Sequence, residues 1–308
     1  MSQGRILVIR GGAIGDFILT LPVLAALRDH FPHARLGLLA YPRVAPLAVA
    51  GGLADETRSI EARPLAAFFA RHGELDAGLQ EFFGSFAIII SYLYDPDGIF
   101  QANIARCSKA RFLSGPHRPD DGAGVHAAEV FLKPLERLAI FGADATPRLR
   151  LEIRSSPSPL LALHPGSGSE RKNWPESRWG ELLRCLAGET ELPLLLVGGE
   201  AEGERLQRLA SDLPAGRVEV AQNLPLSELA VRLANCRGFV GHDSGITHLA
   251  AAVGLPGMVL WGASVETVWR PRSERMSILR GSPGLASLPV ERVLAGIAEL
   301  RTGFRSAR

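Results

Sequence analysis

The sequence is poor in cysteine. Its 308 residues include only Cys107, Cys185 and Cys236, and none of them belongs to a Cys-x-x-Cys pair. A scattered, odd set argues against both a disulfide framework and a zinc site. Such a chain fits a reducing compartment. We therefore expect a cytoplasmic protein that binds no metal.

Strong charge and long apolar runs are also missing. The formal net charge is only +2, and acidic and basic residues are interspersed, so the sequence does not favour a nucleic-acid partner. The strongest apolar runs, Phe86–Ile90 and Leu192–Val197, are far shorter than the roughly 20 residues of a membrane helix. The first residues, MSQGRILVIRGG, lack the design of a signal peptide. If a membrane is involved, we expect peripheral contact at its inner face.

What the chain does have is enough apolar material for two domains. Hydrophobic residues make up 46% of the sequence, and its length allows roughly two domains of 100–200 residues each. The run of serines and prolines at Ser155–Pro159 is the best linker in the chain. We predict one domain over residues 1–155 and a second over residues 156–308.

Short apolar segments alternate with amphipathic ones throughout the chain. The predicted strands are Arg5–Ile9, Arg35–Ala40, Ala87–Ser91, Leu160–Leu163, Leu192–Val197, Val218–Val220, Gly238–Gly241 and Met258–Trp261. The predicted helices are Asp16–His30, one ending near Phe83, His126–Phe141, Pro175–Leu186, Glu202–Ser211, Ser227–Asn235, Ile246–Val253 and Val290–Arg305. Pro22 predicts a kink or a late start in the first helix. This alternation indicates an α/β protein with parallel sheets, whose ligands bind beyond the carboxyl ends of the strands.

Residues 10–16 (RGGAIGD) follow the first predicted strand. Glycines there let the backbone turn sharply and approach a ligand closely. A dinucleotide-binding fingerprint needs glycine in place of Ala13 and an acidic residue near positions 39–41, which read LAY, so a dehydrogenase is disfavoured. Asp16 either caps the following helix or acts as a general base toward an acceptor hydroxyl.

Residues 164–175 (HPGSGSERKNWP) form a small polar loop that ends in Lys172, just before a helix. Backbone N–H groups and a lysine suit a diphosphate. A solvated loop with an incidental lysine is the alternative. The Gly-Ser-Gly-Ser run favours binding, because it costs chain entropy without packing against anything.

Residues 241–250 (GHDSGITHLA) follow another predicted strand and open a helix of small residues. Asp243 or Ser244 fits an ordinary helix cap. The same geometry leaves the amides of Ser244 and Gly245 available to an anion. His248 is either a core histidine or, one turn into the helix, a phosphate contact.

A further pattern, Asp95-Pro96-Asp97, has the D-x-D form that can hold a divalent metal on a nucleotide sugar. Pro96 and Gly98 make a turn the simpler explanation. We therefore expect no metal at this position either.

The segments RGGAIGDFILTLPVLAALRDHFP, HPGSGSERKNWP and HDSGITHLAAAVGLP resemble, in this order and spacing, the heptosyltransferase family, glycosyltransferase family 9. That family transfers heptose from ADP-heptose to the inner core of lipopolysaccharide. The resemblance covers about residues 5–270. It implies a GT-B fold, in which two Rossmann-like, doubly wound domains face each other across a cleft. The acceptor domain comes first, the donor domain second, and the last helix crosses back over the first domain.

The resemblance also implies roles for single residues. The family's catalytic aspartate falls on Asp16 and its phosphate-binding lysine on Lys172. The donor-binding positions are Gly166, Ser167, Gly168, Lys172, Glu204, Leu224, Asp243, Ser244, Gly245 and His248, and Gly12 and Gly15 lie on the acceptor side.

These roles imply an inverting, metal-independent transfer. The co-substrate is a nucleotide sugar, ADP-heptose, with no other cofactor, and the acceptor is a glycan or glycolipid. The sequence leaves open a nucleotide-sugar-binding protein with another donor, such as a UDP-sugar, or one without transferase activity. It also leaves open a sugar-nucleotide epimerase.

Overall fold

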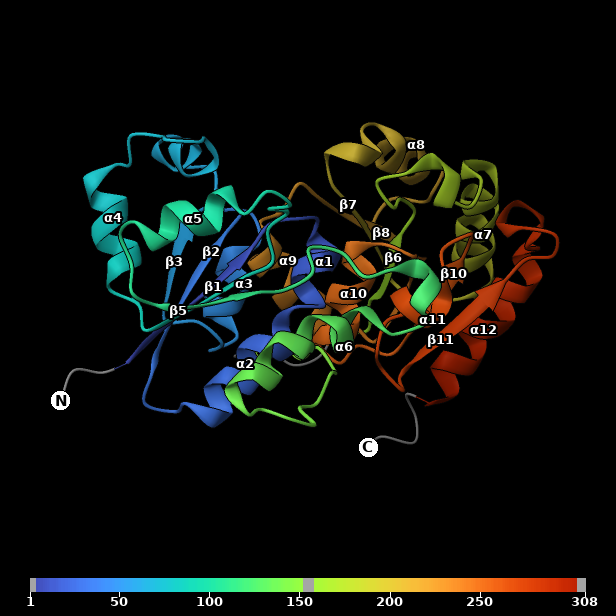
Figure 1. Ribbon diagram of the computed structural model, residues 1–308. Helices are drawn as coiled ribbons and strands as arrows, with labels where there is room; N and C mark the ends of the chain where they lie inside the picture. The colour runs from blue at the N-terminus through green and yellow to red at the C-terminus, as the bar shows by residue number, and fades with distance from the viewer. Residues whose placement is uncertain (1–3, 152–157, 304–308) are drawn as a thin grey trace. The chain divides into compact units, whose positions relative to one another are not determined.

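A computed structural model describes residues 4–151 and 158–303 of the chain (Figure 1). The fold divides into two compact units, Met1–Arg150 and Leu151–Arg308. The predicted boundary between residues 155 and 156 lies outside the described residues, and so does most of the predicted linker. Each unit is an α/β layer structure with its own sheet.

The sheet of the first unit is entirely parallel. Its strand order is β3 (Glu56–Ser59), β2 (Arg35–Ala40), β1 (Arg5–Arg10), β4 (Ile88–Ser91) and β5 (Arg111–Ser114). Side chains alternate between the two faces of each strand. Leu7, Ile9 and Ile89 pack on one face against residues such as Phe83 and Phe100. Figure 1 shows α4 (Ala77–Gly84) and α5 (Ile99–Ala105) on that side of the sheet.

Two predicted helices of the first unit are interrupted, each at a proline. The predicted helix Asp16–His30 is two helices, α1 (Ile14–Ile18) and α2 (Leu21–His30), and Pro22 lies in the first turn of the second. The predicted helix His126–Phe141 is wrong beyond its first half. α6 (Ala127–Leu132) passes into a 3₁₀ helix, Lys133–Leu138, whose first turn contains Pro134. Proline has no N–H for the preceding turn, so a new helical segment starts there.

The remaining elements of the first unit are short. They are α3 (Ala45–Ala50) and the 3₁₀ helices Arg63–Phe69 and Asp121–Ala123. The predicted strand pattern is confirmed at β1, β2 and β4. The edge strands β3 and β5 were not predicted.

The sheet of the second unit has the order β11-β10-β9-β6-β7-β8, again all parallel. Its strands are β6 (Leu161–His164), β7 (Leu194–Gly198), β8 (Val218–Gln222), β9 (Gly238–His242), β10 (Gly257–Trp261) and β11 (Met276–Arg280). In chain order this is the doubly wound 3-2-1-4-5-6 arrangement. The chain therefore reverses its direction of winding between β6 and β9.

Helices cover both faces of this second sheet. α7 (Glu176–Glu189), α8 (Arg205–Ser211) and α12 (Val290–Gly303) contribute side chains to one buried cluster with alternate strand residues. α9 (Leu226–Ala234) contacts α10 (Gly245–Ala252), and the short α11 spans Glu266–Trp269. 3₁₀ turns occupy Glu170–Lys172, Glu200–Glu202 and Leu285–Ser287.

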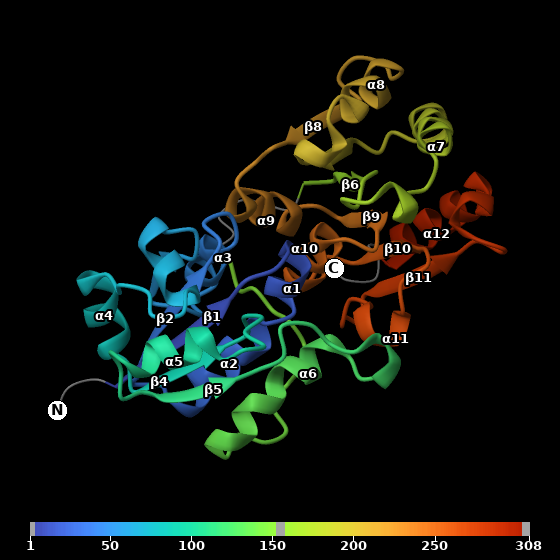
Figure 2. The same cartoon turned by 45° about the horizontal axis from the view of Figure 1, so that its top comes forward.

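α12 lies beside α7 in both views and contacts α7 and β10 (Figures 1 and 2). Its contacts with these elements belong to the second unit, and the predicted crossing over the first domain stays a prediction. Among the described residues, no helix combines the length and the apolar character needed to cross a bilayer.

Candidate functional site

The predicted donor-binding segments meet at the reversal point of the second sheet. β6 and β9 are adjacent, and His164 at the end of β6 is in register with Gly241 of β9. Residues 165–173 leave the end of β6, and Asp243 leads from β9 into α10. A reversal point leaves a crevice at the carboxyl ends of the strands, where doubly wound folds bind ligands.

Lys172 and Asp243 form an ion pair across this point. The Nζ atom of Lys172 lies 2.7 Å from Oδ2 of Asp243, although the two residues are 71 positions apart. The lysine side chain is 39% exposed, whereas that of Asp243 is 8% exposed. The carboxylate is therefore a buried support, and the ammonium group remains accessible to a ligand.

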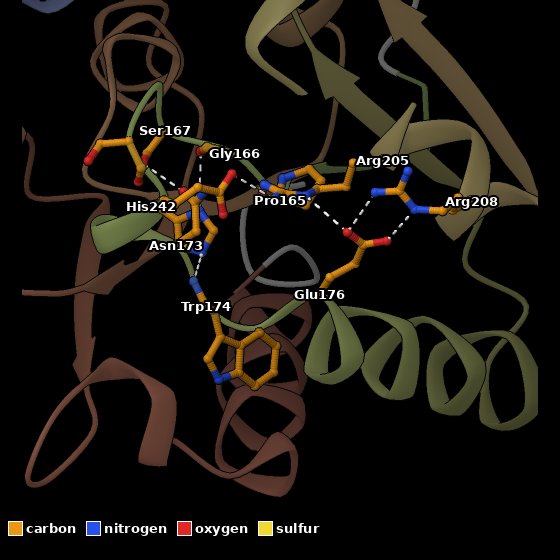
Figure 3. Close-up of polar contacts among 11 residues, drawn as sticks. Pro165, Gly166, Ser167, Asn173, Trp174, Glu176, Arg205, Arg208 and His242 are labelled. Atoms are coloured by element: carbon orange, nitrogen blue, oxygen red, sulfur yellow. Dashed lines mark hydrogen bonds and ion pairs between the residues drawn. The ribbon is translucent and has the colours of Figure 1, made fainter. Parts of the chain in front are cut away.

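His242 fastens the loop that carries Lys172. Its Nε2 accepts a 2.8 Å hydrogen bond from the backbone N–H of Trp174, so Nδ1 carries the proton and donates to the carbonyl of Gly166 at 3.1 Å (Figure 3). The ring is fully buried and lies edge-on to Trp179, with ring centroids 5.4 Å apart. One neutral imidazole thus holds both ends of the loop.

Arginine contacts fix the same loop from the side of α8. The Arg205 guanidinium donates to the carbonyl of Pro165 at 3.4 Å and forms ion pairs with Glu170 and Glu176. Arg208 binds the Glu176 carboxylate through two hydrogen bonds of 2.8 and 2.9 Å (Figure 3). Hydrogen bonds from Arg208 and Arg205 lower the pKa of Glu176, which keeps this anchor ionised.

Glu202, a residue that the sequence analysis passed over, lies beneath the loop. It is 8% exposed, and its Oε2 accepts from the backbone N–H of Gly199 at 2.6 Å. A Cβ atom at Gly166 would lie 1.8 Å from Oε1 of Glu202, so only glycine lets the loop approach this closely. Glu204, one of the predicted donor-binding positions, is exposed at the start of α8.

The other predicted donor positions differ in their placement. The Ser167 hydroxyl lies 2.6 Å from Oδ1 of Asn173 and so closes the loop internally. Gly168 has a φ of +71°, a value that favours glycine. Leu224 is half-buried just after β8, an outer strand of the sheet.

The start of α10 completes the site. Ser244 is the N-cap, and its Oγ accepts from the backbone N–H of Thr247 at 3.3 Å. Gly245 begins the helix, and N–H groups of a first turn have no acceptor within the helix. His248 is buried one turn later. The site thus combines an exposed ammonium group with a helix N-terminus, a combination suited to a diphosphate.

The buried histidines predict an acid-sensitive second unit. Burial lowers the pKa of His242 to about 3, far below the value of roughly 6.5 in an unfolded chain. Burial also lowers the pKa of His164. As the pH falls, these histidines therefore take up protons at a higher pH in the unfolded chain than in the folded one. The contribution of His242 to stability is fully present above about pH 6.5 and is lost as the pH falls toward 3, by up to about 1.4 kcal/mol per pH unit. His164 acts in the same direction.

We expect His242→Asn to be less stable at pH 7 but to lose stability less steeply below pH 6.5. The measurement is urea unfolding followed by tryptophan fluorescence, because Trp174, Trp179, Trp261 and Trp269 all lie in the second unit. His33→Asn, at an exposed histidine of the first unit, is the matched control. If the free energy of unfolding of His242→Asn falls with pH as steeply as that of the wild type, this imidazole is not buried and neutral.

The predicted base, Asp16, lies at the carboxyl end of β1 in the first unit. Its Oδ2 accepts from the backbone N–H of Ala13 at 3.0 Å, so the residue caps α1. Its Oδ1 lies 3.5 Å from Nη2 of Arg10, which is 1% exposed. The side chain of Asp16 is still 24% exposed. The Asp16 carboxylate therefore binds the first turn of α1 and is still accessible to solvent.

The glycines of this turn also fit close packing. Gly12 has a φ of +97°, and an added Cβ would lie 2.9 Å from Oδ2 of Asp16. Gly15 belongs to α1 itself. Asp95 accepts from the backbone N–H groups of Phe100 and Gln101, so the D-x-D segment caps α5. Within residues 4–151 and 158–303, no cluster of three or more His, Cys, Asp or Glu side chains is arranged to hold a metal.

Comparison with known proteins relates much of the chain to a family. Residues 138–288 match the model of glycosyltransferase family 9 (heptosyltransferase). Lipopolysaccharide heptosyltransferase 2 of Salmonella typhimurium is 31% identical over 130 residues, which cover 41% of this chain and 37% of that protein. Lipopolysaccharide heptosyltransferase 1 of Pseudomonas aeruginosa is 34% identical over 127 residues, covering 41% and 34%. The aligned stretch spans little more than a third of these relatives.

A solved structure extends the likeness over nearly the whole fold. The Escherichia coli ADP-heptose lipopolysaccharide heptosyltransferase II superposes with a TM-score of 0.78 at 18% identity, covering 96% of this chain and 98% of that one. This likeness concerns the fold alone. It confirms the expected GT-B type, built from two Rossmann-like units.

Proposed function

Because the chain belongs to glycosyltransferase family 9, the heptosyltransferase family, we propose that it transfers heptose from ADP-heptose to a lipopolysaccharide core or a related glycan. One observation carries the proposal. The exposed ammonium group of Lys172 is held by Asp243 beside the start of α10, at the reversal point of the second sheet. An ammonium group beside a helix N-terminus suits the diphosphate of a nucleotide sugar.

The chemistry is a direct displacement with inversion. The Asp16 carboxylate takes the proton from an acceptor hydroxyl while the hydroxyl oxygen attacks the anomeric carbon of the donor. The bond from that carbon to the diphosphate breaks, and ADP leaves with the electron pair. The new glycosidic bond forms on the opposite face of the sugar, and Asp16 retains the proton.

Charge develops on the leaving diphosphate during this step. In our proposal Lys172 and the N–H groups at the start of α10 neutralise that charge, so the reaction needs no divalent metal. The loop is already fixed by His242 and Arg205 before the donor binds, and preorganised donors are worth most in the transition state. A glycolipid acceptor would bring the protein to the inner face of the cytoplasmic membrane as a peripheral contact.

The test is isothermal titration of ADP, UDP and NAD in the presence of EDTA, followed by a turnover assay with ADP-heptose. We expect ADP to bind more tightly than UDP or NAD without a metal, and ADP-heptose to be consumed only when an acceptor oligosaccharide is present. Tighter binding of UDP than of ADP would indicate that the donor is a UDP-sugar and not ADP-heptose. Binding of ADP without turnover would favour a nucleotide-sugar-binding protein, and a loss of turnover in EDTA would refute the metal-independent mechanism.

A further inference from the structure

An exposed aromatic pair lies at the carboxyl edge of the first sheet. Tyr94 follows β4 and His117 follows β5, two strands that pair directly. Their rings are 4.7 Å apart between centroids, at an interplanar angle of 60°. The tyrosine is 68% exposed. Aromatic residues make up only 6% of the chain, so the exposure of this pair to solvent suggests a function.

The side-chain hydrogen bonds that hold the loop of Tyr94 come from its neighbours. That loop is fixed by the neighbouring Asp95, whose two carboxylate oxygens accept from backbone N–H groups of α5 at 3.1 and 3.0 Å. The core residue of the segment is Tyr92, which is 1% exposed and donates to the carbonyl of Phe131. The ring of Tyr94 is therefore available to a ligand.

The pair is also coupled to the proposed base. Nη1 of Arg10 donates to the carbonyl of His117 at 2.9 Å, and Nη2 of the same guanidinium lies 3.5 Å from Oδ1 of Asp16. The guanidinium is buried and packs 4.4 Å from the ring centre of Phe131. The loop of His117 and the carboxylate of Asp16 are thus fixed to one rigid group.

We infer that Tyr94 and His117 form the platform on which the acceptor sugar stacks. This inference rests on the proposed function and assigns its acceptor subsite. The C–H face of a sugar ring is apolar and weakly positive, so it suits the negative face of an aromatic ring. Arg10, which contacts both the His117 carbonyl and the Asp16 carboxylate, is the positioning residue that links the platform to the proposed base.

The test compares Tyr94→Ala with Tyr94→Phe and with Phe141→Ala. Phe141, which is 69% exposed, is the matched control because it is an equally exposed aromatic residue of the same unit. The probe is de-O-acylated core oligosaccharide from lipopolysaccharide, titrated calorimetrically, with ADP titrated in parallel. We expect Tyr94→Ala to weaken oligosaccharide binding about 5- to 10-fold, while Tyr94→Phe, Phe141→Ala and all ADP titrations stay within twofold of the wild type.

The outcomes separate this inference from the proposed function. If the wild type binds oligosaccharide but does not consume ADP-heptose, the proposed transfer fails, and the comparison of Tyr94→Ala with Phe141→Ala still decides the platform. Equal oligosaccharide affinities in Tyr94→Ala, Phe141→Ala and the wild type overturn the platform. A wild type that binds no oligosaccharide overturns it as well.

Discussion

Replacing Asp16 by asparagine is expected to lower kcat about 10²- to 10⁴-fold, the range in which a positioned general base contributes to catalysis. Asparagine has nearly the same shape, but its amide cannot accept the proton from the acceptor hydroxyl. Product formation from ADP-heptose, followed over time at saturating donor and acceptor, measures the effect. Donor affinity should stay unchanged, because Asp16 belongs to the first unit and the proposed donor-binding residues belong to the second.

The structural role of Asp16 sharpens this test. Its Oδ2 accepts from the N–H of Ala13, the N-cap residue of α1, and the side-chain oxygen of asparagine can accept the same hydrogen bond. A residue that only caps would therefore leave both stability and kcat almost unchanged in Asp16→Asn. Asp16→Ala should in addition lose about 1 kcal/mol of stability through the missing hydrogen bond to the Ala13 N–H.

The control for Asp16→Asn is Asp29→Asn, an exposed carboxylate near the end of α2 in the same unit. It removes one negative charge without touching β1 or α1. If both variants keep wild-type kcat, Asp16 is a cap and not a base. A loss confined to Asp16→Asn supports the base.

Apolar periodicity was sufficient to predict the central strands of both sheets. β1, β2 and β7 are continuous apolar segments because both of their faces are covered. The edge strands β3 (ETRS) and β5 (RFLS) carry polar residues at half or more of their positions. β11 (MSILR) is similarly mixed. Their pairing is determined by the neighbouring strand, so the local pattern could not indicate them.

The sequence predicted those site residues that lie on loops directly after buried strands. Lys172, Asp243 and Ser244 stand out because charged and hydroxyl residues follow buried strands, and the structure brings these three together. No local feature of the sequence showed that Lys172 pairs with Asp243, because the contact joins positions 71 residues apart.

The residues that the sequence analysis missed act through burial. Arg10 and His242 stand at the ends of apolar strands, and Glu202 lies in a loop with other acidic residues. Each is buried and hydrogen-bonds a backbone group: Arg10 and His242 donate to carbonyls of distant segments, and Glu202 accepts from a nearby N–H. A cation or an imidazole at the last position of a buried strand is the one signal that could have indicated such a role.

Replacing Lys172 by alanine is expected to weaken ADP binding about 10- to 100-fold, the worth of a charged hydrogen bond. A further loss of about 10²- to 10³-fold is expected in kcat, because in the proposed mechanism the lysine neutralises charge that appears on the leaving diphosphate. ADP titration and steady-state turnover of ADP-heptose measure the two effects. Arg171→Ala is the matched control, since it removes an exposed cation from the same 3₁₀ turn.

Lys172→Ala also leaves the buried carboxylate of Asp243 unpaired, which alone can repel a diphosphate and destabilise the loop. The double variant Lys172→Ala/Asp243→Asn separates the two causes. Removing the unpaired charge should restore thermal stability and part of the ADP affinity, whereas kcat should stay low. If kcat recovers as well, Lys172 serves only to neutralise Asp243, and the charge on the leaving group must be stabilised by the start of α10 instead.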